Sequence, residues 1–428
     1  MPDLTSSLLP RLFENRLAGL DLPEEYIYPA YAGQSILNIP HSICRWLGVP
    51  EFGEAPLIPE IHQAAGQDVQ RVILILMDAL ALHRLQAWLA EGQAPVWSRL
   101  ANQGLLAPLT SISPSTTSAA LTTLWTGRSP SAHGIAGYEL WLKEYGMVTN
   151  MILHAPMSFK GDVGSLSRAG FKPQDFLPLP TLGVHLKAHG VQTYAFQHYS
   201  IARSGLSQMF LADAEIRPFD TPADLWVSMR QLIESRPQQR QYIWSYWGHV
   251  DGLSHEYGPD DERVVAEFQH FSQAFEQYFL NRLNPGERKN TLLVLTADHG
   301  QIYTPLKLDQ SLNQHPELRH YLHINPTGEN RLTYLYLQPG SQQAVRDYVQ
   351  TNWPDRFIFI DPAQALAAGL FGPSPQHPRL RERTGDLWLA ARDDAYIWWS
   401  EKEDFLLGRH GGLHHQEMLV PLLMTRLD

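Results

Sequence analysis

The chain has 428 residues, 44% of them hydrophobic, and its 12 Trp, 17 Tyr and 16 Phe supply ample apolar surface for a folded core. Its formal net charge of -11 argues against binding of polymeric nucleic acid, because that binding requires a basic face. The only cysteine, Cys44, excludes an intramolecular disulfide and a thiolate cluster around zinc. Any bound metal ion must therefore be held by His and carboxylate side chains.

The sequence contains no segment that suggests contact with a membrane. No stretch of about 18 consecutive apolar residues occurs, and the charged N-terminal segment lacks the apolar run of a signal peptide. We therefore expect a soluble, cytoplasmic protein, and nothing in the sequence predicts its oligomeric state. An acidic chain can still process a small anionic substrate if bound metal ions supply local positive charge.

The first clear element is a strand over residues 72–77. Its apolar residues are continuous rather than alternating, which is typical of a parallel strand that is covered on both faces. The strand runs directly into Asp78. The preceding residues, 1–65, are irregular and rich in proline, and we interpret them as an N-terminal arm or lid.

Strand and helix patterns then alternate, which indicates a doubly wound α/β sheet. We expect a three-layer α/β/α sandwich with a mostly parallel central sheet. Helices are predicted over 80–89, 96–102, 117–124 and 260–283, and strands over 105–112, 191–196, 242–247, 291–296 and 419–424.

Two further segments interrupt this pattern. Residues 138–185 mix aromatic residues, Pro and Gly without periodicity, and we interpret them as a substrate-side insertion. Residues 303–408 contain another set of strands and helices, with a predicted hairpin around Asp393-Asp394, and we interpret them as an inserted cap. The α/β core would then consist of residues 66–302 and 409–428.

Three buried strands each deliver an aspartate at or just beyond the carboxyl end, namely Asp78, Asp251 and Asp298. Open α/β sheets place ligand sites beyond the carboxyl ends of their strands, so these side chains should converge. Three converging carboxylates repel one another unless cations lie between them. The pattern therefore predicts a metal site.

Histidines accompany these aspartates. Asp251 and His255 are four residues apart, so one helical turn can direct both side chains to the same ion. Asp298 and His299 are adjacent at a strand exit, and His410 lies in a glycine-rich loop before the last strand. These oxygen and nitrogen ligands suit two divalent metal ions, with Zn²⁺ as the first choice and Mn²⁺ as the alternative.

Two metal ions about 4 Å apart can bind both the attacking and the leaving oxygen of a displacement at phosphorus, and a hydroxyl nucleophile must then be found. Thr117 is predicted to begin a helix shortly after Pro114, where metal coordination and the helix dipole would stabilise its alkoxide. Thr116 is the rival for this role. Taken alone, either threonine is also a common helix N-cap.

These motifs resemble the alkaline phosphatase superfamily and, within it, the type I phosphodiesterase/nucleotide pyrophosphatase branch. The resemblance extends from about residue 71 to the C-terminus, in the family's order. It rests on Asp78, Pro114-Ser115-Thr116-Thr117, Thr126-Gly127-Arg128-Ser129-Pro130, His133-Gly134-Ile135, Asp251 to His255, Asp298-His299-Gly300 and His410-Gly411-Gly412.

The resemblance implies an alkaline-phosphatase-like fold and a covalent phosphothreonine intermediate at Thr117 that water resolves. It also implies the grouping of the ligands. One metal ion would be held by Asp78, Thr117, Asp298 and His299, and the other by Asp251, His255 and His410.

The sequence departs from the family pattern at three positions. Ala79 and Ser254 stand where the family often has Gly, and Tyr138 stands where many family diesterases have an Asn that contacts a phosphate oxygen. Tyr138 is therefore a candidate substrate-binding residue that bears on substrate preference. His133 is expected to be structural and to hold the loop after Pro130.

The leading hypothesis is a two-metal hydrolase of phosphodiester or pyrophosphate bonds in a small, nucleotide-like molecule. A phosphomonoesterase or phosphonate hydrolase of the same superfamily is the alternative. A sulfatase is disfavoured because Cys44 lies outside the required motif, and a mutase-like isomerase because the acceptor position is Thr rather than Ser. The alternative from another class is a catalytically silent module that binds metal or phosphate.

Overall fold

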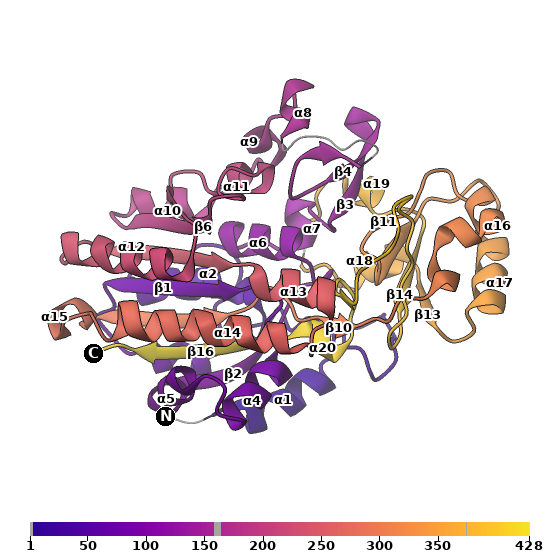
Figure 1. The fold of residues 1–428 in the computed structure, drawn as a ribbon. Helices are drawn as coiled ribbons and strands as arrows, with labels where there is room; N and C mark the ends of the chain where they lie inside the picture. Colours follow the sequence, from indigo (N-terminus) through magenta and orange to yellow (C-terminus); the bar gives the residue numbers. More distant parts are fainter. Residues whose placement is uncertain (1–2, 158–163, 374) are drawn as a thin grey trace.

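The computed structural model describes residues 3–157, 164–373 and 375–428. The predicted arm, insertion and cap each include residues outside these ranges, namely 1–2, 158–163 and 374. The described residues form two large sheets, a helix-covered one and a second one beside it (Figure 1).

The first sheet has the strand order β2-β16-β9-β1-β8-β6-β7. β1 pairs in parallel with β8 and β9, whereas β16 is antiparallel to both of its neighbours, so the sheet is mostly parallel, as predicted. Every residue of β1, β8 and β9 is buried, which explains their continuous apolar runs. The strands are β1 (Arg71–Met77), β2 (Leu105–Thr110), β6 (Gln192–His198), β7 (Glu215–Phe219), β8 (Gln241–Trp247), β9 (Thr291–Thr296) and β16 (Leu419–Arg426).

Helices cover both faces of this sheet, which confirms the α/β fold class. On one face Trp125 packs against Trp244, with ring centroids 5.4 Å apart, and on the other Trp226 packs against Phe275 at 4.8 Å. The first layer contains α2 (Ile39–Trp46), α6 (Thr117–Thr126), α10 (Leu182–Ala188) and α11 (Gly205–Phe210). The second contains α4 (Leu82–Ala90), α5 (Pro95–Gln103), α12 (Pro222–Ser235) and α14 (Glu262–Ala274), which a π-helical turn (Phe275–Leu280) extends.

The second sheet has the order β13-β14-β12-β11-β3-β4-β5 and is antiparallel throughout. It joins residues 139–156 of the predicted insertion to residues 327–391 of the predicted cap, through a pairing of Gly328 with Glu139. The strands are β3 (Glu139–Leu142), β4 (Met147–Asn150), β5 (Ala155–Pro156), β11 (Thr327–Gly328), β12 (Leu332–Leu335), β13 (Phe357–Ile360) and β14 (Leu387–Ala391). α17 (Gln342–Asn352) packs beside it (Figure 1).

The predicted hairpin around Asp393-Asp394 is wrong. β14 already pairs on one side with β12 and on the other with β13, so no free edge remains for a returning strand. The chain turns at Asp393, and Trp398 instead forms an isolated bridge with Ser311.

The N-terminal residues lie along the β2 edge of the first sheet. The Leu4 amide donates to the Leu106 carbonyl at 2.8 Å, and Ser35 forms a parallel bridge with Thr110. α1 (Thr5–Glu14) packs against the same strand. No helix within the described ranges has the length and apolar character needed to cross a membrane.

Candidate active site

The three predicted aspartates lie at the carboxyl edge of three neighbouring strands. β1 leads directly to Asp78 and β9 to Asp298, while β8 leads into α13 (His249–Tyr257), which carries Asp251. β1 lies between β8 and β9 in the sheet. The topology therefore brings together side chains that are far apart in the sequence.

One group of side chains surrounds His299. Its Nε2 lies 3.4 Å from Oδ1 of Asp78, 3.5 Å from Oδ2 of Asp298 and 3.2 Å from Oγ1 of Thr117. Its Nδ1 donates to the Gly300 carbonyl at 2.9 Å, which directs Nε2 toward the carboxylates. His299, Asp78 and Asp298 are all essentially inaccessible to solvent.

A second group surrounds Asp251. Its Oδ1 lies 3.3 Å from Nε2 of His255 and 3.8 Å from Nε2 of His410. The Nδ1 atoms of the two histidines donate to the carbonyls of Gly408 and Ser115, at 2.8 and 3.1 Å, so both Nε2 atoms face the carboxylate.

The two groups adjoin each other. The rings of His299 and His410 stack with centroids 3.8 Å apart, and ligand atoms of Asp251, His299 and His410 lie within 4.8 Å of one another. The same limit holds for Asp78, Asp298 and His299. All seven predicted residues therefore lie in one cluster, with His299 between its two halves.

The charges in this cluster are not balanced by the described protein residues. Oδ1 of Asp78, Oδ1 of Asp251 and Oδ2 of Asp298 are buried and have no hydrogen-bond partner among the described residues. Burial and the neighbouring carboxylates raise the pKa of Asp78 well above its ordinary value, and burial raises that of Asp298. Unpartnered carboxylate oxygens beside imidazole nitrogens that face them fit a site for divalent cations.

The two candidate nucleophiles point to different partners. Thr117 is the first residue of α6, and its hydroxyl faces His299. Thr116 occupies the N-cap position, and its hydroxyl bonds to the carboxyl group of Glu329. The geometry thus favours Thr117, whose hydroxyl lies at the positive end of the helix dipole.

Sequence reasoning missed Tyr246, the penultimate residue of β8. Its hydroxyl donates a hydrogen bond to Oδ2 of Asp78, opposite the unpartnered Oδ1. A tyrosine inside an apolar strand has no motif of its own, and only its position near a strand end could have suggested this contact.

Ala79, which stands where the family often has Gly, adopts a φ of 59°. This region of φ favours Gly, so the backbone at Ala79 is strained.

Tyr138 lies next to the start of α6, because the Ser118 hydroxyl donates to the Gly137 carbonyl at 2.8 Å. Its amide donates to Oε1 of Glu329 at 2.7 Å, and its hydroxyl bonds to Asn150 of β4. Burial raises the pKa of Tyr138 to about 12, so the hydroxyl is neutral at physiological pH.

His133 is held by two hydrogen bonds outside the cluster. The Ile135 amide donates to its Nδ1 at 3.0 Å, so Nε2 carries the proton and donates to the Thr123 hydroxyl, also at 3.0 Å. This arrangement agrees with the structural role that the sequence predicts.

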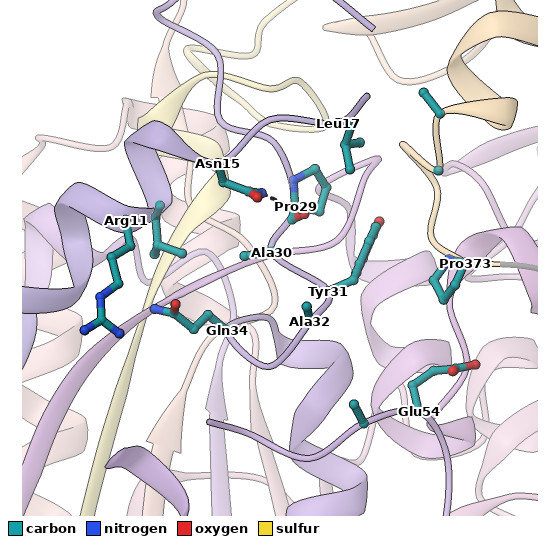
Figure 2. Close-up of a pocket in the computed structure, with 14 residues that line it drawn as sticks. Arg11, Asn15, Leu17, Pro29, Ala30, Tyr31, Ala32, Gln34, Glu54 and Pro373 are labelled. Carbon is teal, nitrogen blue, oxygen red and sulfur yellow. Dashed lines mark hydrogen bonds between the residues drawn. The ribbon is translucent and has the colours of Figure 1, made fainter. Parts of the chain in front are cut away.

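A cavity of about 490 Å³ lies away from the cluster, between the N-terminal arm and residues 368–373 (Figure 2). Arg11, Tyr31 and Glu54 line it, together with apolar side chains. None of the seven predicted residues contributes to its wall. The cavity is connected to the cluster only indirectly. The hydroxyl of Tyr31, in its wall, accepts a hydrogen bond at 3.2 Å from the amide of Ser113, which lies in the loop before Thr117.

An open α/β sheet with His and Asp side chains gathered at its carboxyl edge is an arrangement suited to metal-assisted hydrolysis. The sequence model of the family described as type I phosphodiesterase / nucleotide pyrophosphatase matches residues 72–413. The chain belongs to this family. Its membership supports the prediction that the protein is a phosphoester hydrolase.

Solved structures agree on the fold. Phosphonoacetate hydrolase from Sinorhizobium meliloti 1021, in complex with phosphonoformate, has a TM-score of 0.61 and 17% identity, over 84% of this chain and 91% of that one. Murine ectonucleotide pyrophosphatase / phosphodiesterase 5 has a TM-score of 0.58 and 17% identity, over 82% and 87%. The human counterpart of the latter has a TM-score of 0.58 and 14% identity, over 83% and 87%. The alkaline-phosphatase-like fold expected from the motifs is thereby confirmed.

Proposed function

We propose that this protein is a two-metal hydrolase that cleaves a phosphodiester or pyrophosphate bond of a small, nucleotide-like molecule. The observation that carries the proposal is the position of the Thr117 hydroxyl, 3.2 Å from His299 in a cluster whose three aspartates each have an unpartnered oxygen. A nucleophile and a cation site are thus adjacent at the carboxyl edge of the sheet.

In this proposal the residues hold two divalent ions, Zn²⁺ or Mn²⁺, in the grouping that the family resemblance implies, and the distances above support it. Bound ions would polarise the phosphoryl oxygens and lower the pKa of a coordinated hydroxyl. One ion would be held by Asp78, Thr117, Asp298 and His299, and the other by Asp251, His255 and His410.

The chain's own residues supply the nucleophile and its orientation. Oγ1 of Thr117 attacks phosphorus as its proton leaves to solvent, and the bond from phosphorus to the leaving oxygen breaks. The positive end of α6 stabilises the developing negative charge. Water then cleaves the phosphothreonine ester, which releases the phosphate product and restores the hydroxyl.

We further propose that Tyr138 borders the substrate, because it lies beside the first turn of α6. Its amide and hydroxyl are both engaged, by Glu329 and Asn150, so it offers its ring rather than a hydrogen bond. A planar leaving group would suit this surface. The murine phosphodiesterase has a structure in complex with AMP, a ligand that carries a planar base.

A phosphonate hydrolase or phosphomonoesterase is the second candidate. Two observations favour it, namely Tyr138 in place of the family's Asn and the similarity to a phosphonoacetate hydrolase solved with phosphonoformate and with phosphonoacetate. A catalytically silent module is less well supported, because every expected metal-binding residue is present in the cluster.

The deciding experiment is a panel of diester, nucleotide ester, monoester and phosphonate substrates, assayed with zinc and with manganese. With the best substrate, Thr117→Ala should lower kcat at least roughly 10³-fold, whereas Thr122→Ala, on the same helix, should not. The hydroxyl of Thr122 only donates to the Ser118 carbonyl, at 2.7 Å.

Full turnover by Thr117→Ala would refute the proposed nucleophile. Metal analysis provides an independent check, because fewer than about one bound ion per chain after supplementation would count against catalysis.

A further inference from the structure

The turn between β11 and β12 of the second sheet reaches into the cluster. It is closed by a hydrogen bond from the Glu329 amide to the Leu332 carbonyl, at 3.1 Å. Two of its residues, Glu329 and Arg331, are buried, with 8% and 0% of their surfaces exposed. Two buried charged residues in one turn require buried partners.

Arg331 has its partner in α20 (His415–Met418), which directly precedes β16 of the first sheet. Its Nε and Nη2 donate to the two carboxylate oxygens of Glu417, both at 2.9 Å, and neither side chain is exposed. Its Nη1 donates to the Ala395 carbonyl at 2.6 Å. This two-point contact fixes the orientation of the carboxylate.

Glu417 in turn holds the loop that carries His410. Its Oε1 accepts a hydrogen bond from the Gly412 amide at 2.9 Å, and its carbonyl accepts one from the Gly300 amide, next to His299, at 2.7 Å. The carbonyl of Gly412 accepts a hydrogen bond from the Ser115 hydroxyl at 2.8 Å. A continuous set of contacts therefore leads from Arg331 to both halves of the cluster.

Glu329 contacts the other side of the site. It bonds to the Thr116 hydroxyl and accepts from the Tyr138 amide, on either side of the start of α6. A Cβ added at Gly411 would lie 2.4 Å from the Glu329 side chain, so the absence of a side chain next to His410 makes room for it. Burial raises the pKa of Glu329 to about 8.

We propose that Glu329 and Arg331 are positioning residues, which hold the Thr117 helix start and the His410 loop at the spacing that the reaction requires. The proposal rests on the proposed function and assigns a role in it to the second sheet. Glu329 acts on the nucleophile side through Thr116 and Tyr138. Arg331 acts on the metal side through Glu417 and Gly412.

The metal side is tested by replacing the ion pair with apolar residues, in the double variant Arg331→Met/Glu417→Met. An apolar pair can preserve folding, whereas a single substitution would leave a buried charge without its partner. We expect the purified variant to bind about one ion per chain where wild type binds about two. Outer contacts of this kind contribute roughly 10–100-fold in metal affinity or activity, so kcat should fall by that factor and excess zinc should partly restore it.

The nucleophile side is tested with Glu329→Ala. We expect kcat to fall roughly 10–100-fold while KM and the number of bound ions stay within about twofold of wild type. Glu329→Gln keeps one acceptor oxygen and should recover part of the loss. The matched control is Arg383→Met, another buried arginine of the second sheet region, which donates to the Gly134 carbonyl at 2.8 Å and pairs with Glu144.

The outcomes separate the two proposals. An inactive wild type would refute the proposed function itself, and an active Thr117→Ala would refute the nucleophile on which it rests. If wild type is active and Thr117→Ala is not, then folded Arg331→Met/Glu417→Met with two bound ions, or Glu329→Ala with unchanged kcat, would overturn the positioning role. A loss of the same size in Arg383→Met would also overturn it, because the effect would then reflect general packing.

Discussion

Tyr246 fixes one oxygen of Asp78 and leaves the other free toward His299. Tyr246→Phe should therefore lower zinc affinity or kcat roughly 10–100-fold, since the carboxylate loses the contact that sets its rotation. Tyr242→Phe, in the same strand but packed against Trp125, should be close to wild type. Zinc titration and steady-state kinetics measure both effects, and equal behaviour of the two variants would contradict this role.

His133 makes the folded state sensitive to acid. Burial, helped by His377 and Arg383, lowers its pKa to about 3, whereas an unfolded histidine titrates near 6.5. As the pH falls, the unfolded chain binds the proton first, so the stabilisation present above pH 6.5 is lost progressively down to about pH 3.

The loss attributable to His133 between pH 7 and pH 5 is about 2 kcal/mol. Chemical denaturation of wild type and His133→Gln at both pH values isolates it, because all other titrating groups are common to the two proteins. The variant should be less stable at pH 7 but should show a smaller decline. An identical decline would show that the pKa of His133 is the same in the folded and unfolded chains.

The sequence identifies the seven cluster residues because they recur at strand exits and in motifs with fixed spacing. Tyr246, Glu329, Arg331 and Glu417 could not be identified in this way. Each is a single residue without a motif, and its role depends on a contact with a segment far away in the chain.

At the scale of elements, Gly300 lets the segment that follows β9 pack closely against α20. A Cβ at this position would lie 2.0 Å from the Gln416 carbonyl oxygen and 2.7 Å from Cβ of Ala81. Gly104, which precedes β2 at the opposite edge of the sheet, provides a matched control, since a Cβ there would lie 2.0 Å from the Met424 carbonyl oxygen.

Both Gly300→Ala and Gly104→Ala should destabilise the fold by about 1–3 kcal/mol, because the backbone must shift to admit the methyl group. Only Gly300→Ala should also lose bound zinc and activity. Thermal denaturation combined with metal analysis separates the two effects. Loss of metal in Gly104→Ala would mean that any distortion of the sheet empties the site.

Six strands of the first sheet were predictable because buried strands have continuous apolar runs, whereas β7 was missed because only Phe219 of its residues is buried. The second sheet was not, because its strands come from residues 139–156 and 327–391, and nothing local indicates that these segments pair. The hairpin at Asp393 was wrong for a related reason. A turn can be recognised locally, whereas the availability of a strand edge depends on the whole sheet.

For the whole molecule, metal removal should lower the stability. A chelator would leave the carboxylates of Asp78, Asp251 and Asp298 close together and unbalanced. Zinc at about 100 times its Kd should restore about 2.7 kcal/mol, visible as a rise in Tm.

Asp251→Asn is the informative comparison for this prediction. It removes one of the mutually repelling charges, so the metal-free variant should be more stable than metal-free wild type. It also removes a ligand, so zinc should raise its Tm less. Equal Tm values for wild type with and without chelator would show that the cluster holds no ion.

β16 lies between β2 and β9 in the first sheet, although it follows both of them in the sequence. On the ribosome, β2 and β9 emerge long before residues 419–426, and each must wait with an unpaired edge until β16 arrives. His410 also emerges only shortly before that strand. The cluster of Asp and His side chains is therefore assembled only after residues 419–426 have been made, and a nascent chain would acquire its metal ions no earlier than that.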